Sequence, residues 1–299
     1  MNTKHYSKDD LDNILSVKGN SLYSNALKRL LRNKASLISL IILSLITLLS
    51  FFGPYLLQYD FYETDWNSIY LPPNIENGHY FGTDGNGRDL LVRILYGGRL
   101  SLSIGIIATL VSVSIGVTYG TVAGYAGGKV DTIMMRIVEI LYAMPYLIFV
   151  IILMVVFGRN IYLLFIAIGA VEWLTMARIV RGQTISIKEK EFIEASKSLG
   201  QSSLLIIIKH IIPNLAGTII VYITLMVPSV IILESFLSFL GLGVQEPLTS
   251  WGVLISEGAR EMETAWWLLI FPGLFMVLTL ASLNFIGDGL RDALDPKEY

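Results

Sequence analysis

EKEFIEASKSLGQSSLLIIIKHIIPN, residues 189–214, is a charged, helix-patterned stretch in a chain that is otherwise mostly apolar. It opens with Glu189, three residues after Ser186, and this capping-box spacing predicts a helix that begins there. Apolar and small residues then recur at three- and four-residue steps, which gives the helix one weakly apolar face: Phe192, Ala195, Ser196 and Leu199.

Gly200 predicts the end of this first helix, because glycine readily takes the left-handed conformation that commonly ends helices. Ser202 or Ser203 can cap a second helix, and Pro213 is expected to interrupt it. The stretch therefore predicts a helix, a sharp turn and a second helix. Such units also occur in ordinary loops, so the pattern alone leaves its purpose open.

The composition around this stretch is that of a membrane protein. The chain has 299 residues, of which 54% are hydrophobic and 15% charged, and its mean hydropathy is +0.62. Its repeated apolar runs approach the roughly 20 residues that a bilayer core requires. A net charge of −2 gives no indication of a nucleic-acid partner. The lack of cysteine excludes disulfides and a thiol nucleophile, and the three histidines have no metal-ligand spacing.

Six membrane spans are expected, at about 35–57, 98–124, 133–157, 160–178, 213–236 and 266–287. With the N-terminus inside, the inner segments carry 17 of the 22 lysines and arginines and the outer segments carry 5. This asymmetry favours cytoplasmic N- and C-termini and places the 179–212 loop in the cytoplasm. The third and fourth spans are expected to form a tight hairpin around Gly158.

These spans divide the chain into five parts. They are a cytoplasmic tail at 1–34, a first anchor at 35–57, an extracytoplasmic loop at 58–97, a core of five spans at 98–290, and a cytoplasmic tail at 291–299. The core contains the loop 186–214 and an outer loop at 237–265. The outer loop mixes apolar residues, glycines and a proline, which suggests a partly embedded segment, and Trp266 and Trp267 are expected in the aromatic belt.

Basic residues beside an apolar stripe at 21–33 favour a helix that lies on the inner leaflet and contacts anionic lipid. The alternative is a disordered polar tail. The apolar run that follows, 35–52, is expected to be an anchor and not a removed signal peptide, because the positive region is long and a small-residue cleavage site is lacking.

Glycines mark two further segments. GTDGNGRD at 82–89 predicts turns and an Asp or Asn that caps the following helix, and it lacks the acidic spacing of an EF-hand. Small residues between Gly105 and Gly124 predict close helix packing in the second span. The glycine-rich run at 120–129 fails as a nucleotide loop, since Val130 stands where Ser or Thr is needed. We therefore expect no ATP hydrolysis by this chain.

Three acids fall within or beside the expected spans: Glu139, Glu172 and Glu234. Ionised groups are costly there unless they face water or a partner, so each is a candidate for the translocation path. The alternative is a position near a helix end, paired with Arg136, Arg178 or outer water. Prolines are expected to bend three spans, at Pro145, Pro228 and Pro272.

Residues 194–213 resemble the EAA loop of ABC importer permeases. That pattern has Glu-Ala-Ala, a glycine four residues after the second alanine, and an Ile-x-Leu-Pro ending. Glu194, Ala195 and Gly200 match it, while Ser196 replaces the second alanine. His210 stands at the isoleucine, Ile212 at the leucine, and Pro213 matches.

Three more segments resemble the C-type subunit of peptide permeases in particular. They are the Gly-Thr-Asp-x-x-Gly-Arg-Asp sequence at 82–89, ESFLSFLGLGV with a following Ser-Trp-Gly at 234–252, and NFIGDGLRDALDP at 284–296. The resemblance covers about 79–296.

The resemblance implies an all-α polytopic membrane protein with the type I ABC importer permease fold, in a bacterial-type cell membrane. It implies uptake of oligopeptides or dipeptides, or of nickel or other metal chelates. The implied partners are a second related permease, two ATPase subunits that use ATP and Mg²⁺, and an extracytoplasmic binding protein. No cofactor is expected on this chain. The residues implied to couple to the ATPases are Glu191, Glu194, Ala195, Ser196, Leu199, Gly200, His210 and Pro213.

Two other classes of protein remain as alternatives. A secondary transporter driven by an ion gradient would not need the EAA loop. An intramembrane enzyme would need a Ser–His pair, an acid pair or metal-spaced ligands at membrane depth, and the sequence shows none.

Overall fold

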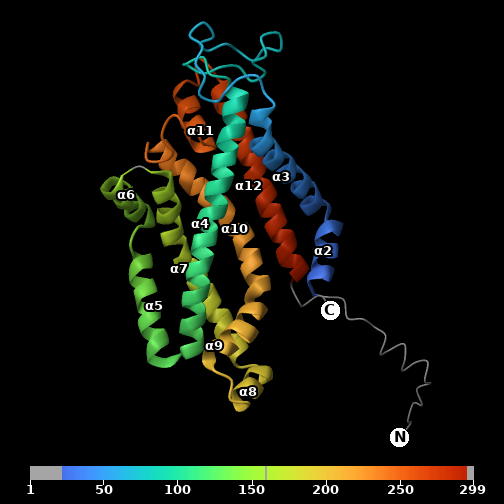
Figure 1. Ribbon diagram of the computed structural model, residues 1–299, viewed down its shortest axis with the longest axis vertical. Coiled ribbons are helices and arrows are strands. Elements are labelled where there is room, and N and C mark those ends of the chain that lie inside the picture. Colours follow the sequence, from blue (N-terminus) through green and yellow to red (C-terminus); the bar gives the residue numbers. More distant parts are fainter. Residues whose placement is uncertain (1–21, 159, 295–299) are drawn as a thin grey trace, which may run out of the picture.

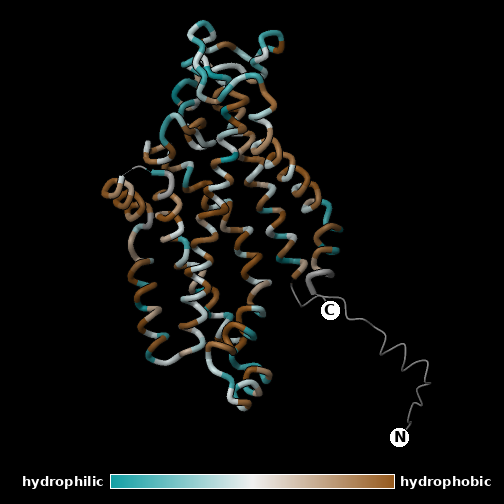
Figure 2. The backbone as a smooth tube through the Cα atoms, in the orientation of Figure 1, coloured by the Kyte–Doolittle hydropathy of each residue, from teal (hydrophilic) through white to brown (hydrophobic). Residues whose placement is uncertain are grey.

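The computed structural model describes residues 22–158 and 160–294, and its regular structure is helical apart from one isolated bridge between Thr83 and Asp89. Long helices form a bundle. At one end lies an irregular segment, residues 56–89, which we call the cap, and at the other end lies the short helix α8 (Glu191–Ser198) (Figure 1). Hydrophobic residues follow the long helices, and hydrophilic residues gather in the cap and around α8 (Figure 2). Residues 1–21 of the expected N-terminal tail (1–34) and residues 295–299 of the expected C-terminal tail (291–299) lie outside the described residues.

The chain enters through two helices joined at Asn33. Helix α2 (Leu22–Arg32) lies where a surface helix was expected, with Ala26 buried and Leu27 and Leu31 exposed. The Asn33 side chain caps α3 (Lys34–Phe52), and a 3₁₀ turn η1 (Gly53–Tyr55) ends this first span. Many large apolar side chains of α3 are exposed, as suits a helix that faces lipid.

Helix α4 (Leu90–Ala126) is longer than the predicted span 98–124. It begins early because the Asp89 carboxylate accepts a hydrogen bond from the Val92 amide at 2.9 Å, which confirms a cap from the 82–89 motif. Its glycines allow close packing on α7 (Ile161–Lys188). A Cβ at Gly120 would lie 2.4 Å from the Ala177 carbonyl oxygen, so the predicted small-residue contact is confirmed.

The predicted span 133–157 consists of two helices, α5 (Gly128–Ala143) and α6 (Tyr146–Phe157), which meet at 83°. The break lies at the expected Pro145, because a proline forces the residue before it, Met144, into the extended conformation. Helix α7 then runs past the predicted end at 178 to Lys188. The predicted helix start at Ser186–Glu189 is therefore wrong, since Ser186 continues α7.

The second helix of the predicted pair is the start of a long membrane helix. α9 (Ser203–Ile206), the π-helical segment η2 (Ile207–Ile211) and α10 (Ile212–Phe239) form one continuous helix. Pro213 does not interrupt it. Proline has no backbone N–H to donate, and the π-helical segment η2 directly before it already departs from the regular α-helical hydrogen-bond pattern. Pro228 lies inside the same helix.

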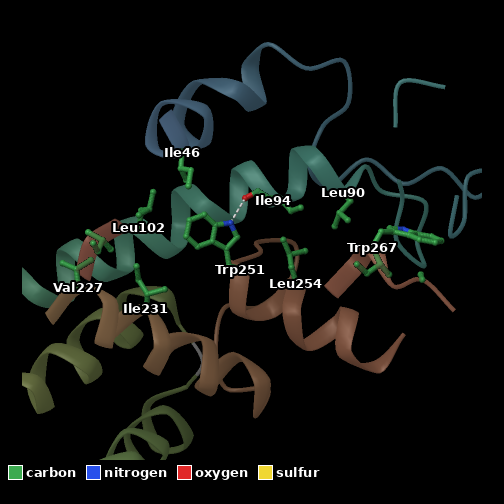
Figure 3. Packing of buried hydrophobic residues seen from close by; sticks show 12 residues of the cluster. Ile46, Leu90, Ile94, Leu102, Val227, Ile231, Trp251, Leu254 and Trp267 are labelled. Atoms are coloured by element: carbon green, nitrogen blue, oxygen red, sulfur yellow. Dashed lines mark hydrogen bonds between the residues drawn. The ribbon is translucent and has the colours of Figure 1, made fainter. Parts of the chain in front are cut away.

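The outer segment 237–265 contains α11 (Trp251–Arg260), which leads into α12 (Trp267–Leu294) with Pro272 inside it. Trp251 is fully buried, and its indole nitrogen donates to the Ile94 carbonyl oxygen at 3.0 Å (Figure 3). Trp266 is half exposed, whereas Trp267 is buried and donates to the Thr83 carbonyl oxygen at 3.2 Å. The indole of Trp267 therefore packs inside the protein, where it ties α12 to the cap.

Within the described residues, five helices are long and apolar enough to cross a membrane, and the bent pair α5–α6 makes up to six. Six spans agree with the number expected from the sequence. The middle of the bundle is α4 packed against α7, with α3, α10 and α12 around them (Figure 1).

Candidate coupling and translocation site

Helix α8 is held to the bundle by one fully buried side chain. Ile193 is 0% exposed and packs in a cluster with Met176 of α7 and Ile206 and Ile211 of the following helix. Acidic residues stand in its first turn and Lys197 in its last, which suits the helix dipole. Helix α8 is thus attached to α7 and to the start of the long helix that continues as α10.

Gly200 makes the turn after α8, with φ of 75°, as expected for a left-handed residue. Its amide donates to the Lys197 carbonyl oxygen at 2.9 Å, and the Gln201 amide donates to the Ser196 carbonyl oxygen at 3.2 Å. The Ser202 hydroxyl accepts from the Leu205 amide at 3.4 Å, which confirms Ser202 as the cap of α9.

The two residues that depart most from the EAA pattern contact each other. The Ser196 hydroxyl lies 3.4 Å from Nε2 of His210, and the same nitrogen lies 3.2 Å from the Gln201 side-chain oxygen. The buried Ser196 also donates to the Phe192 carbonyl oxygen at 2.8 Å. His210 therefore joins the start of the long membrane helix to α8.

The other predicted coupling residues lie on the surface. They are Glu191, Glu194, Ala195, Leu199, Gly200 and Pro213. Leu199, a large apolar side chain, has 81% of its surface exposed. The coupling set thus divides into a buried part that holds α8 and an exposed part that is available to another protein.

A second attachment of α8, at Tyr125 near the end of α4, was not expected from the sequence. The Lys188 ammonium donates to the Tyr125 carbonyl oxygen at 2.6 Å. Lys188 and Lys197 lie 5.6 and 5.8 Å from the Tyr125 ring centroid, so α7 and α8 both meet α4 there. Nothing in the local sequence around Tyr125 indicates this contact, because its partners lie more than 60 residues away.

The three candidate path acids have different surroundings. Glu139 lies on α5, is mostly exposed and pairs with Arg136 at 3.0 Å, which was the alternative expected for it. Glu172 of α7 is half-buried, and among the described residues it makes no ion pair or side-chain hydrogen bond. Its suggested partner Arg178 stacks instead on Tyr142, with 3.7 Å between the guanidinium carbon and the ring centroid.

Glu234 is fully buried in α10, away from the outer water considered as its alternative. Its Oε1 accepts hydrogen bonds from the hydroxyls of Ser238 and Ser250, each at 2.7 Å. Ser250 also caps α11 by accepting from the Val253 amide at 3.2 Å. Glu234 therefore connects α10 to the first turn of α11.

The 82–89 motif forms a buried ion cluster that the sequence did not reveal. Asp84 binds Arg88 at 2.7 Å and also contacts Arg93. Arg88 reaches Glu246 at 3.1 Å, and Arg93 reaches Glu257 at 3.2 Å. These groups line a pocket of about 290 Å³ in the cap. The cluster ties the start of α4 to the segment around α11.

Comparison with known proteins identifies the class. The model of binding-protein-dependent transport system inner membrane components matches residues 116–298, and the model of the N-terminal transmembrane domain of oligopeptide transport permease C matches residues 21–73. The chain belongs to the family of binding-protein-dependent transport system inner membrane components. This membership confirms the family expected from the EAA loop.

Oligopeptide permease subunits are among the relatives that are more than half identical to this chain. It is 54% identical to the oligopeptide transport system permease protein OppC of Haemophilus influenzae and 56% identical to OppC of Escherichia coli strain K12. These matches cover 95% of this chain and 91% and 94% of the relatives. It is also 46% identical to the dipeptide transport system permease protein DppC of Bacillus subtilis, over 94% of this chain and 88% of that one.

A solved structure with a similar fold is the inward-facing MetNI methionine ABC transporter. The match has a TM-score of 0.56 and 17% sequence identity, and it covers 69% of this chain and 96% of the other. At this identity the likeness concerns the fold alone, and it confirms the expected type I importer permease architecture.

Proposed function

We propose that this chain is a transmembrane permease subunit of an ATP-driven importer of oligopeptides or dipeptides. The observation that carries the proposal is the identity of 54–56% to oligopeptide permease subunits along 95% of the chain. The 46% identity to a dipeptide permease supports the same class of substrate. Uptake of nickel or another metal chelate is the second candidate, since it was expected from the same resemblance.

The proposed transporter needs four further parts. A second related permease would complete the path, two ATPase subunits would use ATP and Mg²⁺, and an extracytoplasmic binding protein would deliver the peptide. The exposed coupling residues, among them Glu194, Ala195 and Leu199, support docking of α8 on an ATPase. In this scheme α8 faces the cytoplasm, and this chain has no catalytic residue and binds no cofactor.

The buried contacts of α8 suggest how ATPase movement would reach the membrane. Ile193 packs against α7, His210 joins α8 to the helix that continues as α10, and Lys197 meets Tyr125 of α4. Movement of α8 would therefore displace three membrane helices together. Glu139, Glu172 and Glu234 remain proposed path residues, with Glu234 acting from inside the bundle.

The test is reconstitution of the chain with its neighbouring-gene partners in lipid vesicles. Uptake of a labelled tripeptide should require both ATP and the loaded binding protein, because transport energy enters only through the partner ATPases. An ionophore that collapses ion gradients should leave uptake unchanged. Uptake that follows an ion gradient without ATP would refute the proposal, and uptake of nickel chelate but no peptide would favour the second candidate.

A further inference from the structure

The end of the molecule that carries the cap is strongly acidic. The two expected outer loops, 58–97 and 237–265, together contain ten acidic residues, three arginines and no lysine. Their formal charge is therefore −7, although the whole chain has a charge of only −2. Hydrophilic residues gather at this end of the bundle (Figure 2). A surface of one sign attracts a partner of the opposite sign over about 10 Å at physiological salt.

Within this acidic end, a pocket of about 290 Å³ opens between the cap and α11. Its two buried cations are Arg88 and Arg93. Both bind the buried Asp84, and each also binds one glutamate, Glu246 for Arg88 and Glu257 for Arg93. Three carboxylates therefore surround two guanidinium groups, so the positive charge inside the pocket is already neutralised.

The accessible charges of the pocket are mainly carboxylates. The side chains of Glu246 and Glu257 are 64% and 37% exposed, and Glu261 is partly exposed. Arg260 is the one exposed cation among the described residues that line the pocket. Burial, and after it the Glu261 carboxylate, raises the pKa of the Tyr70 hydroxyl, which lines the same pocket. Negative charge is thus in excess where a partner can reach it.

These groups fit a cation better than an anion. An anion would have to compete with Asp84, Glu246 and Glu257 for the two buried arginines. An ammonium or guanidinium group needs no such exchange, because a carboxylate has about four acceptor positions and Glu246 and Glu257 each accept one hydrogen bond from an arginine. Lysine and arginine side chains are long enough to place a charge in the pocket while their backbone stays outside it.

We propose that this acidic pocket receives a lysine or arginine side chain of the extracytoplasmic binding protein and so determines where that protein docks. The inference rests on the proposed peptide import, in which α8 faces the cytoplasm and the cap faces the binding protein. It names the chemistry by which this partner is recognised. The pocket includes Arg93 of α4, and α4 also contacts α8 through Tyr125, so docking and coupling meet on one helix.

The experiment uses the complete transporter in vesicles and varies the concentration of loaded binding protein. The measured quantity is the concentration that gives half-maximal ATP-dependent uptake of a tripeptide. Glu261→Gln should raise it about threefold and Glu261→Lys about tenfold, since the first removes one attractive charge and the second reverses it. Glu261 is chosen because it forms no ion pair with Arg88 or Arg93 among the described residues, so the ion cluster stays intact.

The matched controls are Glu76→Gln and Glu76→Lys, which change the net charge equally at an exposed position of the cap that does not line the pocket. Both should leave the half-saturating concentration within about twofold of its original value. Added salt should reduce the difference between Glu261→Lys and the unsubstituted protein, because salt screens the attraction. Absence of an effect at Glu261, or equal effects at the two positions, would overturn the inference. If unsubstituted transporter shows no uptake dependent on ATP and binding protein, the proposed function itself fails.

The occupant of the pocket is identified by crosslinking, because the chain has no cysteine and a single one can be introduced. Asn86 lines the pocket, and its backbone amide, which a substitution keeps, donates to Asp84. Asn86→Cys, labelled with a benzophenone maleimide and illuminated, should form an adduct with the binding protein. Asn77→Cys, at an exposed position of the cap outside the pocket, should form much less. Equal yields at the two positions, or an adduct with the second permease or the peptide instead, would overturn the inference.

Discussion

Glu234 illustrates what one buried carboxyl group does in this bundle. Two serine hydroxyls donate to its Oε1, while its Oε2 has no hydrogen-bond partner among the described residues. Since Ser250 is the N-cap residue of α11, the carboxyl group holds α11 against α10. A change in this side chain therefore reaches the cap as well as the membrane helix.

We predict that Glu234→Gln changes the rate of peptide uptake while the transporter still assembles. The amide oxygen can accept from both serines, but the amide nitrogen brings two buried donors without acceptors, at a cost of about 1–3 kcal/mol. The measurement is uptake in vesicles together with copurification of the partner subunits. Glu263→Gln, at an exposed position in the same outer segment, is the control. Unchanged rate and affinity in Glu234→Gln would leave this residue with a structural role only.

At the scale of elements, α8 and the helix after it act as a pair only if the turn between them is stiff. Gly200 has a φ of 75°, and a Cβ there would meet no atom within 4 Å. A side chain at position 200 is therefore disfavoured by the left-handed backbone conformation and not by contact with neighbouring atoms. This separates the turn from the glycines of α4, where close packing excludes a side chain.

We predict that Gly200→Val uncouples ATP hydrolysis from transport without preventing folding. A β-branched residue disfavours the left-handed conformation by about 1–2 kcal/mol, so α8 should lose its orientation. ATP hydrolysis should persist while peptide uptake falls about tenfold, both measured in the same vesicles. Gly200→Asn, which tolerates this conformation, should retain uptake, and Gly182→Ala in an open position on α7 is a second control. Normal uptake by Gly200→Val would count against α8 as the coupling element.

For the molecule as a whole, α4 connects the cap at one end of the bundle to the coupling helix α8 at the other. Its first turn is capped by Asp89 and lies in the ion cluster of the cap, and its last residues include Tyr125, which meets Lys188 and Lys197. Arg93, near the start of α4, links this helix to Glu257 of α11. The cap and the coupling helix α8 are thus both attached to the single continuous helix α4.

We predict that Asp84→Asn strongly destabilises the protein. Asp84 is buried and contacts both Arg88 and Arg93. Without its negative charge, the positive charges of these two buried guanidinium groups are only partly neutralised. Breaking a buried ion pair in this way typically lowers the free energy of unfolding by about 3–5 kcal/mol. Thermal unfolding of the purified transporter measures the effect, with Glu76→Gln at an exposed position of the same loop as the control. Equal midpoints for the two variants would show that the cluster is not what stabilises the cap.

Helix boundaries show where prediction from sequence was limited. The capping-box spacing of Ser186 and Glu189 predicted the start of a helix, but Ser186 lies inside α7. The packing of α7 against α4 outweighs this local capping signal. Pro213 was expected to interrupt a helix and instead lies inside the continuous helix Ser203–Phe239, directly after the π-helical segment η2. Both errors come from local signals whose outcome depends on neighbouring helices.

The sequence by itself determined the membrane class, the number of spans and the position of the EAA loop, because hydropathy, charge asymmetry and the conformational freedom of Gly200 are properties of local chain chemistry. Only the tertiary structure decided which charges meet. The Asp84 cluster, the Ser196–His210 contact, the two lysines at Tyr125 and the stacking of Arg178 on Tyr142 all join residues from different elements. Their energies depend on distance and burial, which the order of residues does not specify until the helices pack.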